Sequence, residues 1–404
     1  MKALRFNPTL TRFAALKTLG RVNPRMFYEG PLATVQLEDV AEPAPPRAGW
    51  MSVDTRMCGF CGSDLNMIFL RDSPTATPFV SFPATMGHEF FGTVTAVGQG
   101  VSSVREGDRV VVAPHLNCPC RGIAEPCAAC RAGRPGSCEN FARGELSPGM
   151  ITGLCRDVGG GFAPRVNVHE TQAFALPPDL PERAAVMIEP FSVALAAVFD
   201  NLPGPGERVL VVGGGVIGSL VVHALTVLEC GCEITVVEPG EFAAEFAQKA
   251  GAHHIVRDGD IGGAAVRLAG ATSHRPVMGA PICTGGFDRV FDTVGNSATL
   301  NACLRAMTVR GTLSVIGVGH DVHLDLTPLW LKVQTIQGVY AYGVVKWKGR
   351  KVHVYEAALE LAAQNPDFLA SMVTHEFPLS DWRDMIRVNL AKGRHRAMKT
   401  VAVF

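Results

Sequence analysis

The chain has 404 residues, of which 47% are hydrophobic and 18% are charged, and its 37 basic and 37 acidic residues give a formal net charge of zero. The length exceeds what one ordinary core holds, so we expect two domains. The balanced charge argues against nucleic acid as the main partner, and no run of about 18 apolar residues is present to span a membrane.

The first residues alternate as a strand does, and we predict a strand over residues 1–6. The first twenty residues carry four basic side chains and no acid, which also resembles a transit peptide, but they lack the apolar core and cleavage site of a secretory signal. Twelve cysteines without such a signal suit a reducing compartment. We therefore expect a cytoplasmic protein whose cysteines bind metal rather than form disulfides.

A β-rich region follows, in which short apolar runs are separated by Gly and Pro. They predict strands of an antiparallel or mixed sheet over residues 35–40, 51–57, 90–98 and 108–113.

Five cysteines then lie close together, at Cys118, Cys120, Cys127, Cys130 and Cys138. Two thiolates two residues apart, such as Cys127 and Cys130, can bind one tetrahedral zinc, and a further pair completes the four ligands. Since five candidates compete for four places, the spacing alone leaves the choice open.

The pattern of apolar residues changes near Pro177, from short strand-like runs to a helical period. Residues 177–201 have a long helical period, and apolar strands then alternate with helices. The strands are predicted at residues 208–214, 233–238, 253–256, 288–295 and 312–319, and the helices at 216–228, 241–252 and 297–309. This order predicts an α/β domain with a doubly wound parallel sheet. Residues 274–290 are expected to form a loop without an assigned function, and a helix over 353–365 and a strand over 398–404 close the chain.

A glycine-rich turn joins the first of these strands to its helix. Gly213, Gly215 and Gly218 have the G-x-G-x-x-G spacing, in which the glycines allow a tight turn, close approach of a pyrophosphate and helix–strand packing. The intervening residues, Val216 and Ile217, open the helix whose free N–H groups bind phosphate. The complete β–α–β context makes a dinucleotide site more probable than an unrelated turn.

Glu238 ends the second strand, where an acid hydrogen-bonds the adenosine ribose 2′-OH. Residues 239–242 contain no basic side chain, so a 2′-phosphate would be repelled. We therefore predict NAD(H) rather than NADP(H).

Three further residues are candidates for a metal site of a different kind. Cys61, His88 and Glu189 offer a soft, a borderline and a hard donor, a set that suits Zn²⁺ with one open position. Each alone has an ordinary alternative, as a buried thiol, a hydrogen-bonding imidazole or a helix acid. The surrounding motifs decide between these interpretations.

The motifs GFCGSD, GHEFFGTVTAVG, GDRVV, IEP and GGGVIG, together with the cysteine cluster, occur in an order that resembles the zinc-dependent medium-chain alcohol, polyol and threonine dehydrogenases. The resemblance implies a GroES-like β-rich catalytic domain over residues 1–188 with a structural zinc lobe, a Rossmann NAD-binding domain over 189–338, and a return to the catalytic domain over 339–404. It places the active site between the domains.

The resemblance also implies the roles of single residues. Cys61, His88 and Glu189 would hold a catalytic zinc, Glu89 would be the second acid beside it, and Ser63 would pass on the alcohol proton. Asn66 stands where many relatives have a histidine that relays this proton, so the proton must leave by another route. Glu189 replaces a cysteine and resembles the polyol branch. Cys58 is interpreted as structural.

The cysteine cluster would bind a second, structural zinc through Cys118, Cys127, Cys130 and Cys138, with Cys120 as the alternative to Cys118. Lys399 resembles a basic residue that reaches the cofactor pyrophosphate, and a solvated surface lysine is the alternative. Residues 65–82 are expected to contribute to the substrate pocket, although their aromatic side chains could equally pack the core.

The sequence thus predicts an NAD-dependent and zinc-dependent oxidation of a secondary or primary alcohol to a ketone or aldehyde. The partners are a small-molecule alcohol or carbonyl substrate and copies of the same chain in a homodimer or homotetramer. Two alternatives remain open, a zinc-free quinone or enone reductase and a non-catalytic NAD-binding protein.

Overall fold

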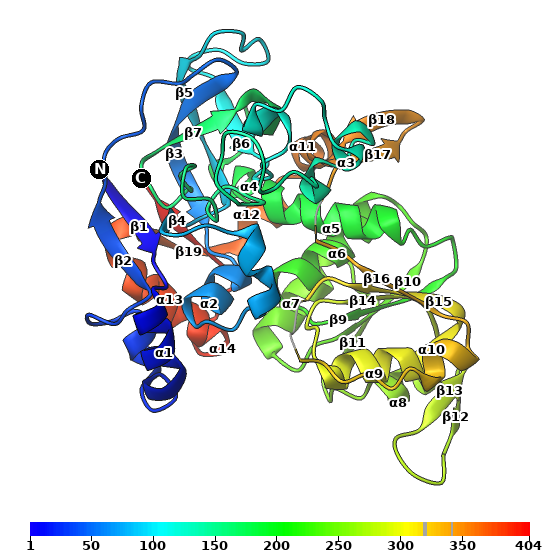
Figure 1. Cartoon of the computed structure of the whole chain (residues 1–404). Coiled ribbons are helices and arrows are strands. Elements are labelled where there is room, and N and C mark those ends of the chain that lie inside the picture. Colours follow the sequence, from blue (N-terminus) through cyan, green and yellow to red (C-terminus); the bar gives the residue numbers. More distant parts are fainter. Residues whose placement is uncertain (318–320, 341) are drawn as a thin grey trace. The chain divides into compact units, whose positions relative to one another are not determined.

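The computed structural model describes residues 1–317, 321–340 and 342–404, which form two compact units (Figure 1). The first unit comprises Met1–Glu189 and Tyr342–Phe404, and the second comprises Pro190–Ala341. None of the described helices is long and apolar enough to cross a membrane.

The first unit is built on a seven-stranded sheet in the order β19-β20-β3-β5-β6-β8, with β7 paired to β3. Only β19 and β20 are parallel, and the other pairs are antiparallel. The strands are β3 (Trp50–Gly59), β5 (Glu89–Val97), β6 (Arg109–Val112), β7 (Arg165–His169), β8 (Ala173–Ala175), β19 (Val373–Pro378) and β20 (Lys399–Val403).

Smaller elements surround this sheet. A three-stranded sheet has the order β2-β1-β4 and a hairpin pairs β17 with β18. These strands are β1 (Lys2–Phe6), β2 (Val35–Asp39), β4 (Ala84–Thr85), β17 (Val344–Trp347) and β18 (Arg350–His353). The helices are α1 (Leu10–Leu19), α2 (Gly62–Ile68), α3 (Ala128–Arg131), α4 (Glu182–Ala185), α11 (Val354–Gln364), α12 (Asp367–Met372), α13 (Trp382–Leu390) and α14 (Lys392–His395).

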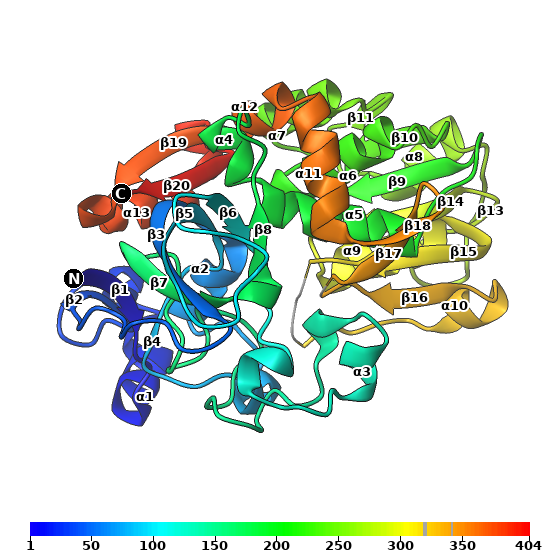
Figure 2. The same ribbon diagram turned by 90° about the horizontal axis from the view of Figure 1, so that it is seen from above.

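The second unit is a six-stranded, entirely parallel sheet in the order β11-β10-β9-β14-β15-β16, which Figure 2 shows side by side. The strands are β9 (Arg208–Val212), β10 (Glu233–Val237), β11 (His254–Val256), β14 (Phe287–Asp292), β15 (Met307–Val315) and β16 (Thr335–Gly338). Numbered from β9, this is the 3-2-1-4-5-6 order of dinucleotide-binding folds, in which the ligand lies where the order reverses, between β9 and β14.

Helices cover both faces of the parallel sheet, with α6 and α7 on one face and α8, α9 and α10 on the other (Figure 1). They are α6 (Val216–Val227), α7 (Glu241–Ala250), α8 (Ile261–Leu268), α9 (Ser297–Ala306) and α10 (Thr327–Leu331), and α5 (Ile188–Asp200) carries the chain from the first unit into the second. Since both faces are covered, strands such as β9, RVLVV, read as continuous apolar runs.

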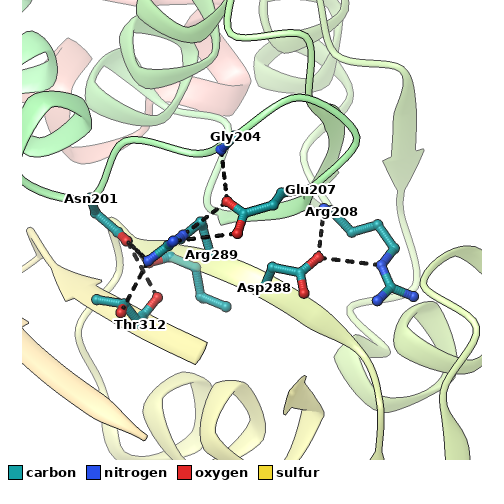
Figure 3. Close-up of polar contacts among 8 residues, drawn as sticks. Asn201, Gly204, Glu207, Arg208, Asp288, Arg289 and Thr312 are labelled. Carbon is teal, nitrogen blue, oxygen red and sulfur yellow. Dashed lines mark hydrogen bonds and ion pairs between the residues drawn. The ribbon is translucent and has the colours of Figure 1, made fainter. Parts of the chain in front are cut away.

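A polar network fixes the amino ends of the central strands in this unit (Figure 3). Arg289 of β14 forms two hydrogen bonds with Glu207, at 3.0 and 3.3 Å, and Glu207 also accepts from the backbone N–H of Gly204 at 2.8 Å. Asp288 accepts from the backbone N–H of Arg208 at 2.8 Å. These contacts set β9 against β14 at the end opposite to the glycine-rich turn.

The structure differs from the predicted elements in several places. The helical stretch over 177–201 is broken into α4 and α5, because the ring of Pro190 tolerates only the first turn of a helix and α5 therefore begins at Ile188. The helix predicted over 297–309 ends at Ala306, and β15 begins directly at Met307.

Two other predictions concern the segments around β14 and β15. Residues 274–290, expected to be a loop, belong partly to an antiparallel hairpin of β12 (Thr272–His274) and β13 (Ile282–Thr284). The strand predicted over 312–319 ends at Val315, and its residues 318 and 319 lie outside the described part of the chain.

Candidate functional site

A thiol, an imidazole and a carboxylate meet at one edge of the large sheet of the first unit. The ligand atoms of Cys61, His88 and Glu89 all lie within 4.8 Å of one another. Antiparallel pairing of β3 with β5 sets Gly59 opposite Glu89, so the residues just beyond, Cys61 and His88, come together. A Cβ at Gly59 would lie 2.3 Å from Glu89 Oε2, so a larger residue here would displace the Glu89 carboxylate from the cluster.

Asp64 supports this cluster from helix α2. It is 2% exposed, and its Oδ2 accepts a hydrogen bond from the backbone N–H of Cys61 at 2.8 Å. Its Oδ1 lies 3.8 Å from His88 Nδ1, which directs the other ring nitrogen, Nε2, toward the cluster. Burial disfavours the charged imidazole, but the Asp64 carboxyl and the Cys61 thiol outweigh it and raise the pKa of His88 well above its usual value.

Ser63 also contacts the imidazole. Its Oγ lies 3.5 Å from His88 Nε2, which places a hydroxyl beside the cluster where a proton could be exchanged. Asn66 lies half-buried in the same helix as Ser63. Its amide does not titrate near neutral pH, so it cannot take up the proton as a histidine would.

Lys399 lies at this site and is buried, so it is not the solvated surface lysine that the sequence left as an alternative. The side chain is 2% exposed and its ammonium pairs with Glu89 Oε2. Burial raises the pKa of Glu89, but Lys399 and His88 outweigh it and hold that pKa below its usual value. The predicted contact of Lys399 with a pyrophosphate stays a prediction, and what the structure shows is a counter-charge for Glu89.

Glu189 is buried in the first turn of α5, but it is not one of the three residues whose ligand atoms cluster. Its Oε1 accepts a hydrogen bond from the hydroxyl of Tyr342 at 2.9 Å. Burial and the nearby charge of Glu89 raise the pKa of Glu189 to about 7. The structure thus brings together Cys61, His88 and Glu89, and it places Glu189 close enough to Glu89 for their charges to interact.

A second group of ligands lies in the cysteine lobe. The sulfur atoms of Cys118, Cys127, Cys130 and Cys138 lie within 4.8 Å of one another. Cys118 Sγ and Cys138 Sγ are 3.6 Å apart, and Cys127 Sγ and Cys138 Sγ are 4.0 Å apart. All twelve cysteines of the chain are thiols in this structure.

Backbone and side-chain N–H groups point at these sulfurs, as they do around thiolates. Cys118 Sγ accepts from Cys127 N and from Asn140 Nδ2, both at 3.3 Å, and Cys127 Sγ accepts from Glu139 N at 3.4 Å. Burial alone would raise the pKa of Cys127, but the backbone N–H groups of Cys130 and Glu139 outweigh it and lower that pKa to about 6.

Cys120 points elsewhere. Its Sγ contacts Thr171 Oγ1 at 3.6 Å and the carbonyl of His115 at 4.0 Å, and burial raises the pKa of its thiol to about 11. Its neighbour Arg121 is fully buried and donates to the carbonyls of Arg143, Leu146, Ser147 and Gly149, which folds the following loop around the lobe.

Both clusters suit zinc by the chemistry of their donors. Four sulfurs in one shell correspond to a closed structural site, whereas one sulfur, one nitrogen and one carboxylate leave a position for another ligand.

The glycine-rich turn of the second unit follows β9. Gly213 has φ +91°, and a Cβ at Gly218 would lie 1.8 Å from the carbonyl oxygen of Gly213, so both positions require glycine for the fold. A Cβ at Gly215 would meet nothing within 4 Å. Packing thus leaves Gly215 unexplained, and its predicted role in the approach of a pyrophosphate to the start of α6, at Val216 and Ile217, stays a prediction.

Glu238 lies beside this turn at the end of β10. Its Oε2 accepts from Gly214 N at 2.7 Å and its Oε1 from Gly240 N at 2.6 Å, which fixes the carboxylate while further lone pairs can accept from a ribose. Arg257 lies near the same turn and donates to the carbonyl of Pro239 at 2.9 and 3.1 Å. The prediction from the sequence considered only residues 239–242 and missed this basic group, which directly follows strand β11.

The expected substrate stretch, residues 65–82, is divided: its first part packs the core, whereas residues 71–72 and 74–78 are exposed. Met67 and Phe69 are 8% and 6% exposed in the main cluster of the first unit, and Phe82 packs against it. The residues near the metal cluster that sequence reasoning missed are Asp64 and Tyr342. Asp64 lies in the CGSD motif and could have been identified there, whereas Tyr342 is 153 positions from Glu189 and carries no signal.

Comparison with known proteins assigns the chain to a family. Residues 47–178 match the alcohol dehydrogenase GroES-like domain, and residues 216–364 match the zinc-binding dehydrogenase family. The chain is 29% identical to a probable diacetyl reductase ((R)-acetoin forming) of Saccharomyces cerevisiae, over 86% of this chain and 82% of the relative. It is 28% identical to the (R,R)-butanediol dehydrogenase of Bacillus subtilis, over 86% and 90%.

Among solved structures, the Escherichia coli dehydrogenase rspB, complexed with NADH, superposes with a TM-score of 0.73 at 22% identity, over 91% of this chain and 96% of the other. The fold is therefore a GroES-like domain joined to a Rossmann domain. The chain belongs to the zinc-binding medium-chain alcohol dehydrogenase family and is an oxidoreductase of that class.

Proposed function

We propose that this chain is a zinc-dependent dehydrogenase that transfers hydride between an alcohol and NAD(H), giving a ketone or an aldehyde. The observation that carries the proposal is the cluster of Cys61, His88 and Glu89 within 4.8 Å, with Glu189 buried nearby. Residues 1–188 and 339–404 would form the catalytic domain, and residues 189–338 the cofactor domain.

When bound, a zinc ion supplies Lewis acidity that polarises the oxygen of the substrate. The chain's own residues prepare the site for it. Asp64 holds the Cys61 backbone and faces His88, and Lys399 neutralises Glu89, so these side chains are fixed before any ligand arrives. Cys61, His88 and Glu189 would hold the ion, with Glu89 as the second acid beside it. Ser63 brings its hydroxyl to 3.5 Å from His88 Nε2 and is the group we assign to accept the alcohol proton.

We propose one catalytic and one structural zinc per chain. The four clustered sulfurs of Cys118, Cys127, Cys130 and Cys138 support the second, and the separate position of Cys120 supports Cys118 as its fourth ligand.

The cofactor assignment rests on the glycine turn and on Glu238. The open space at Gly215 and the fixed carboxylate of Glu238 support NAD(H), and rspB is a relative of the same fold complexed with NADH. The guanidinium of Arg257 contacts the carbonyl of Pro239, next to Glu238, and is a positive charge near the expected position of the ribose. The test of the cofactor is therefore a comparison of kcat/KM with NAD and with NADP.

For the substrate, we propose a secondary alcohol that carries a second polar group on the adjacent carbon. The names of the relatives support this class, since they include diacetyl, butanediol, sorbitol and threonine among their substrates. No observation favours the enone reductase or the non-catalytic protein over a dehydrogenase.

We also propose a reducing compartment such as the cytoplasm, and a homo-oligomer. The grouping of four cysteine sulfurs in one shell of metal-ligand type supports the former. For the latter, β16 is the edge strand of the parallel sheet, and Val309, Trp330, Leu331 and Val333 are each 58–78% exposed in the same unit. Size-exclusion chromatography with multi-angle light scattering would give the number of chains in the assembly.

The test is a screen of NAD reduction over vicinal diols, amino alcohols, simple secondary alcohols and primary alcohols, with metal content measured on the same sample. We expect the highest kcat/KM with a vicinal diol or amino alcohol, loss of activity on chelation and its return with Zn²⁺. Activity that survives complete removal of zinc would overturn the proposal.

A further inference from the structure

Behind Glu189 lies a chain of buried hydroxyl groups. The Tyr342 hydroxyl is 2.9 Å from Glu189 Oε1, and the Tyr355 hydroxyl is 3.1 Å from the Tyr342 hydroxyl and 3.3 Å from the carbonyl oxygen of Val112. Tyr342 is 4% exposed, Tyr355 is not exposed, and Glu189 is 6% exposed. The chain therefore links the carboxylate to the backbone at the end of β6 without passing through solvent.

The direction of these hydrogen bonds follows from the donors available. An ionised carboxylate only accepts, so the single proton of Tyr342 is donated to Glu189. The single proton of Tyr355 then lies between two acceptors, the Tyr342 hydroxyl at 3.1 Å and the carbonyl oxygen of Val112 at 3.3 Å. Because Tyr342 donates to Glu189, this hydrogen bond favours the ionised form of that carboxylate and holds its Oε1 in place.

Ring packing fixes Tyr342 in this position. The His115 ring meets it edge-on, with centroids 4.6 Å apart at 83°, and the Tyr355 ring lies 5.1 Å away. Tyr355 is held in turn by Phe174 at 5.1 Å and His353 at 5.7 Å. Rings packed on several sides lose little further freedom when the hydroxyl forms a hydrogen bond, so the Tyr342 hydroxyl is preorganised.

We propose that Tyr342 is a positioning residue that holds Oε1 of Glu189, so that the carboxylate presents its other oxygen to the metal beside Cys61 and His88. This inference rests on the proposed function, since it assigns Glu189 to the catalytic zinc. It explains why a carboxylate that is not among the three clustered donors is nevertheless buried next to them. Tyr355 acts one step further away, by orienting Tyr342.

The inference predicts how tightly the metal is held. Loss of a group that orients a metal ligand typically lowers metal affinity roughly 10- to 100-fold. We expect Tyr342→Phe to weaken binding of the catalytic zinc within this range and Tyr355→Phe to weaken it less. Tyr28→Phe is the matched control, because Tyr28 is 3% exposed in the same unit and its ring packs against Phe69 at 6.1 Å.

The experiment is competition of the purified full-length protein and its variants with a chromophoric zinc chelator, which gives one dissociation constant per zinc. The constant for the cysteine lobe serves as an internal reference for folding. In addition, the protein is loaded with Co²⁺ at the catalytic site, where the visible d–d bands report the oxygen donor. We expect Tyr342→Phe to change the dissociation constant of the catalytic zinc and the d–d bands, and Glu189→Gln to change them further.

Unchanged constants and d–d bands in Tyr342→Phe, alongside a clear effect of Glu189→Gln, would overturn the role of Tyr342 and leave the proposed function standing. No effect of Glu189→Gln would overturn the assignment of Glu189 and the inference with it. Absence of zinc-dependent NAD reduction in the unmodified protein would instead end the proposed function, while the metal constants still decide the role of Tyr342.

Discussion

At the scale of single residues, the buried ion pair between Lys399 and Glu89 organises the metal cluster. Both side chains are 2% exposed, so each charge depends on the other. Removing one partner of a buried pair leaves an uncompensated charge, which typically costs about 3–5 kcal/mol, whereas an exposed pair contributes up to about 1 kcal/mol.

Lys399→Met should therefore lower the free energy of unfolding by about 3–5 kcal/mol in urea titrations at neutral pH. The exposed pair of Lys2 with Asp39, 58% and 75% exposed, provides the control, and Lys2→Met should change stability by less than about 1 kcal/mol. Adding Glu89→Gln to Lys399→Met should recover part of the loss. Equal effects of the two lysine substitutions would contradict the pairing.

At the scale of elements, the loop that carries the five cysteines brings four of the sulfurs together and directs the fifth, that of Cys120, away from them. Cys118 accepts hydrogen bonds from Cys127 N and Asn140 Nδ2 within the cluster, whereas Cys120 contacts Thr171. Cys118→Ser should lose one zinc per chain and unfold at lower temperature. Cys120→Ser should keep its full zinc content in plasma mass spectrometry, and loss of zinc from that variant alone would reverse the assignment.

Helix α6 buries a histidine that should make stability depend on pH. His223 is 6% exposed, packs 5.5 Å from the Phe191 ring, and burial lowers its pKa from 6.5 to about 4. Between these values the unfolded chain binds a proton that the folded chain does not, so stability falls as the pH drops from 6.5 toward 4. The difference of 2.5 pKa units (6.5 minus 4) corresponds to about 3 kcal/mol.

Urea titrations at pH 4.5 and 7 should show that His223→Phe loses less stability on acidification than the unmodified chain. His274→Phe, at an exposed position, is the control and should retain the full pH dependence. A His223→Phe variant with the same acid sensitivity as the unmodified chain would show that His223 is already protonated in the fold or titrates alike in both states.

At the scale of the whole molecule, the sequence predicts best what local periodicity encodes. The parallel sheet follows from continuous apolar strands alternating with helices, because each strand is covered on both faces. The hairpin of β12 and β13 escaped prediction because its strands have three residues each and β12 is fully exposed, so no apolar pattern marks it.

The same distinction holds for the site. Cys61 and His88 are recognisable because their motifs are local, and the pairing of β3 with β5 then brings them together. Tyr342 and the ion pair of Lys399 could not be predicted, because both depend on residues more than 150 positions away that meet only through the sheet and helix packing. Arg257 near Glu238 depends likewise on the neighbouring strand.

The central claim is that Cys61, His88 and Glu189, with Glu89 beside them, hold a zinc on which hydride transfer depends. The most direct test is the zinc content and the NAD-reduction rate of Cys61→Ser, measured on one preparation beside the unmodified protein and Cys120→Ser. We predict that Cys61→Ser keeps one zinc of two and loses turnover by at least about 1000-fold, since the Lewis acid contributes several kcal/mol to the barrier. A Cys61→Ser protein with full zinc and unchanged turnover would contradict the claim.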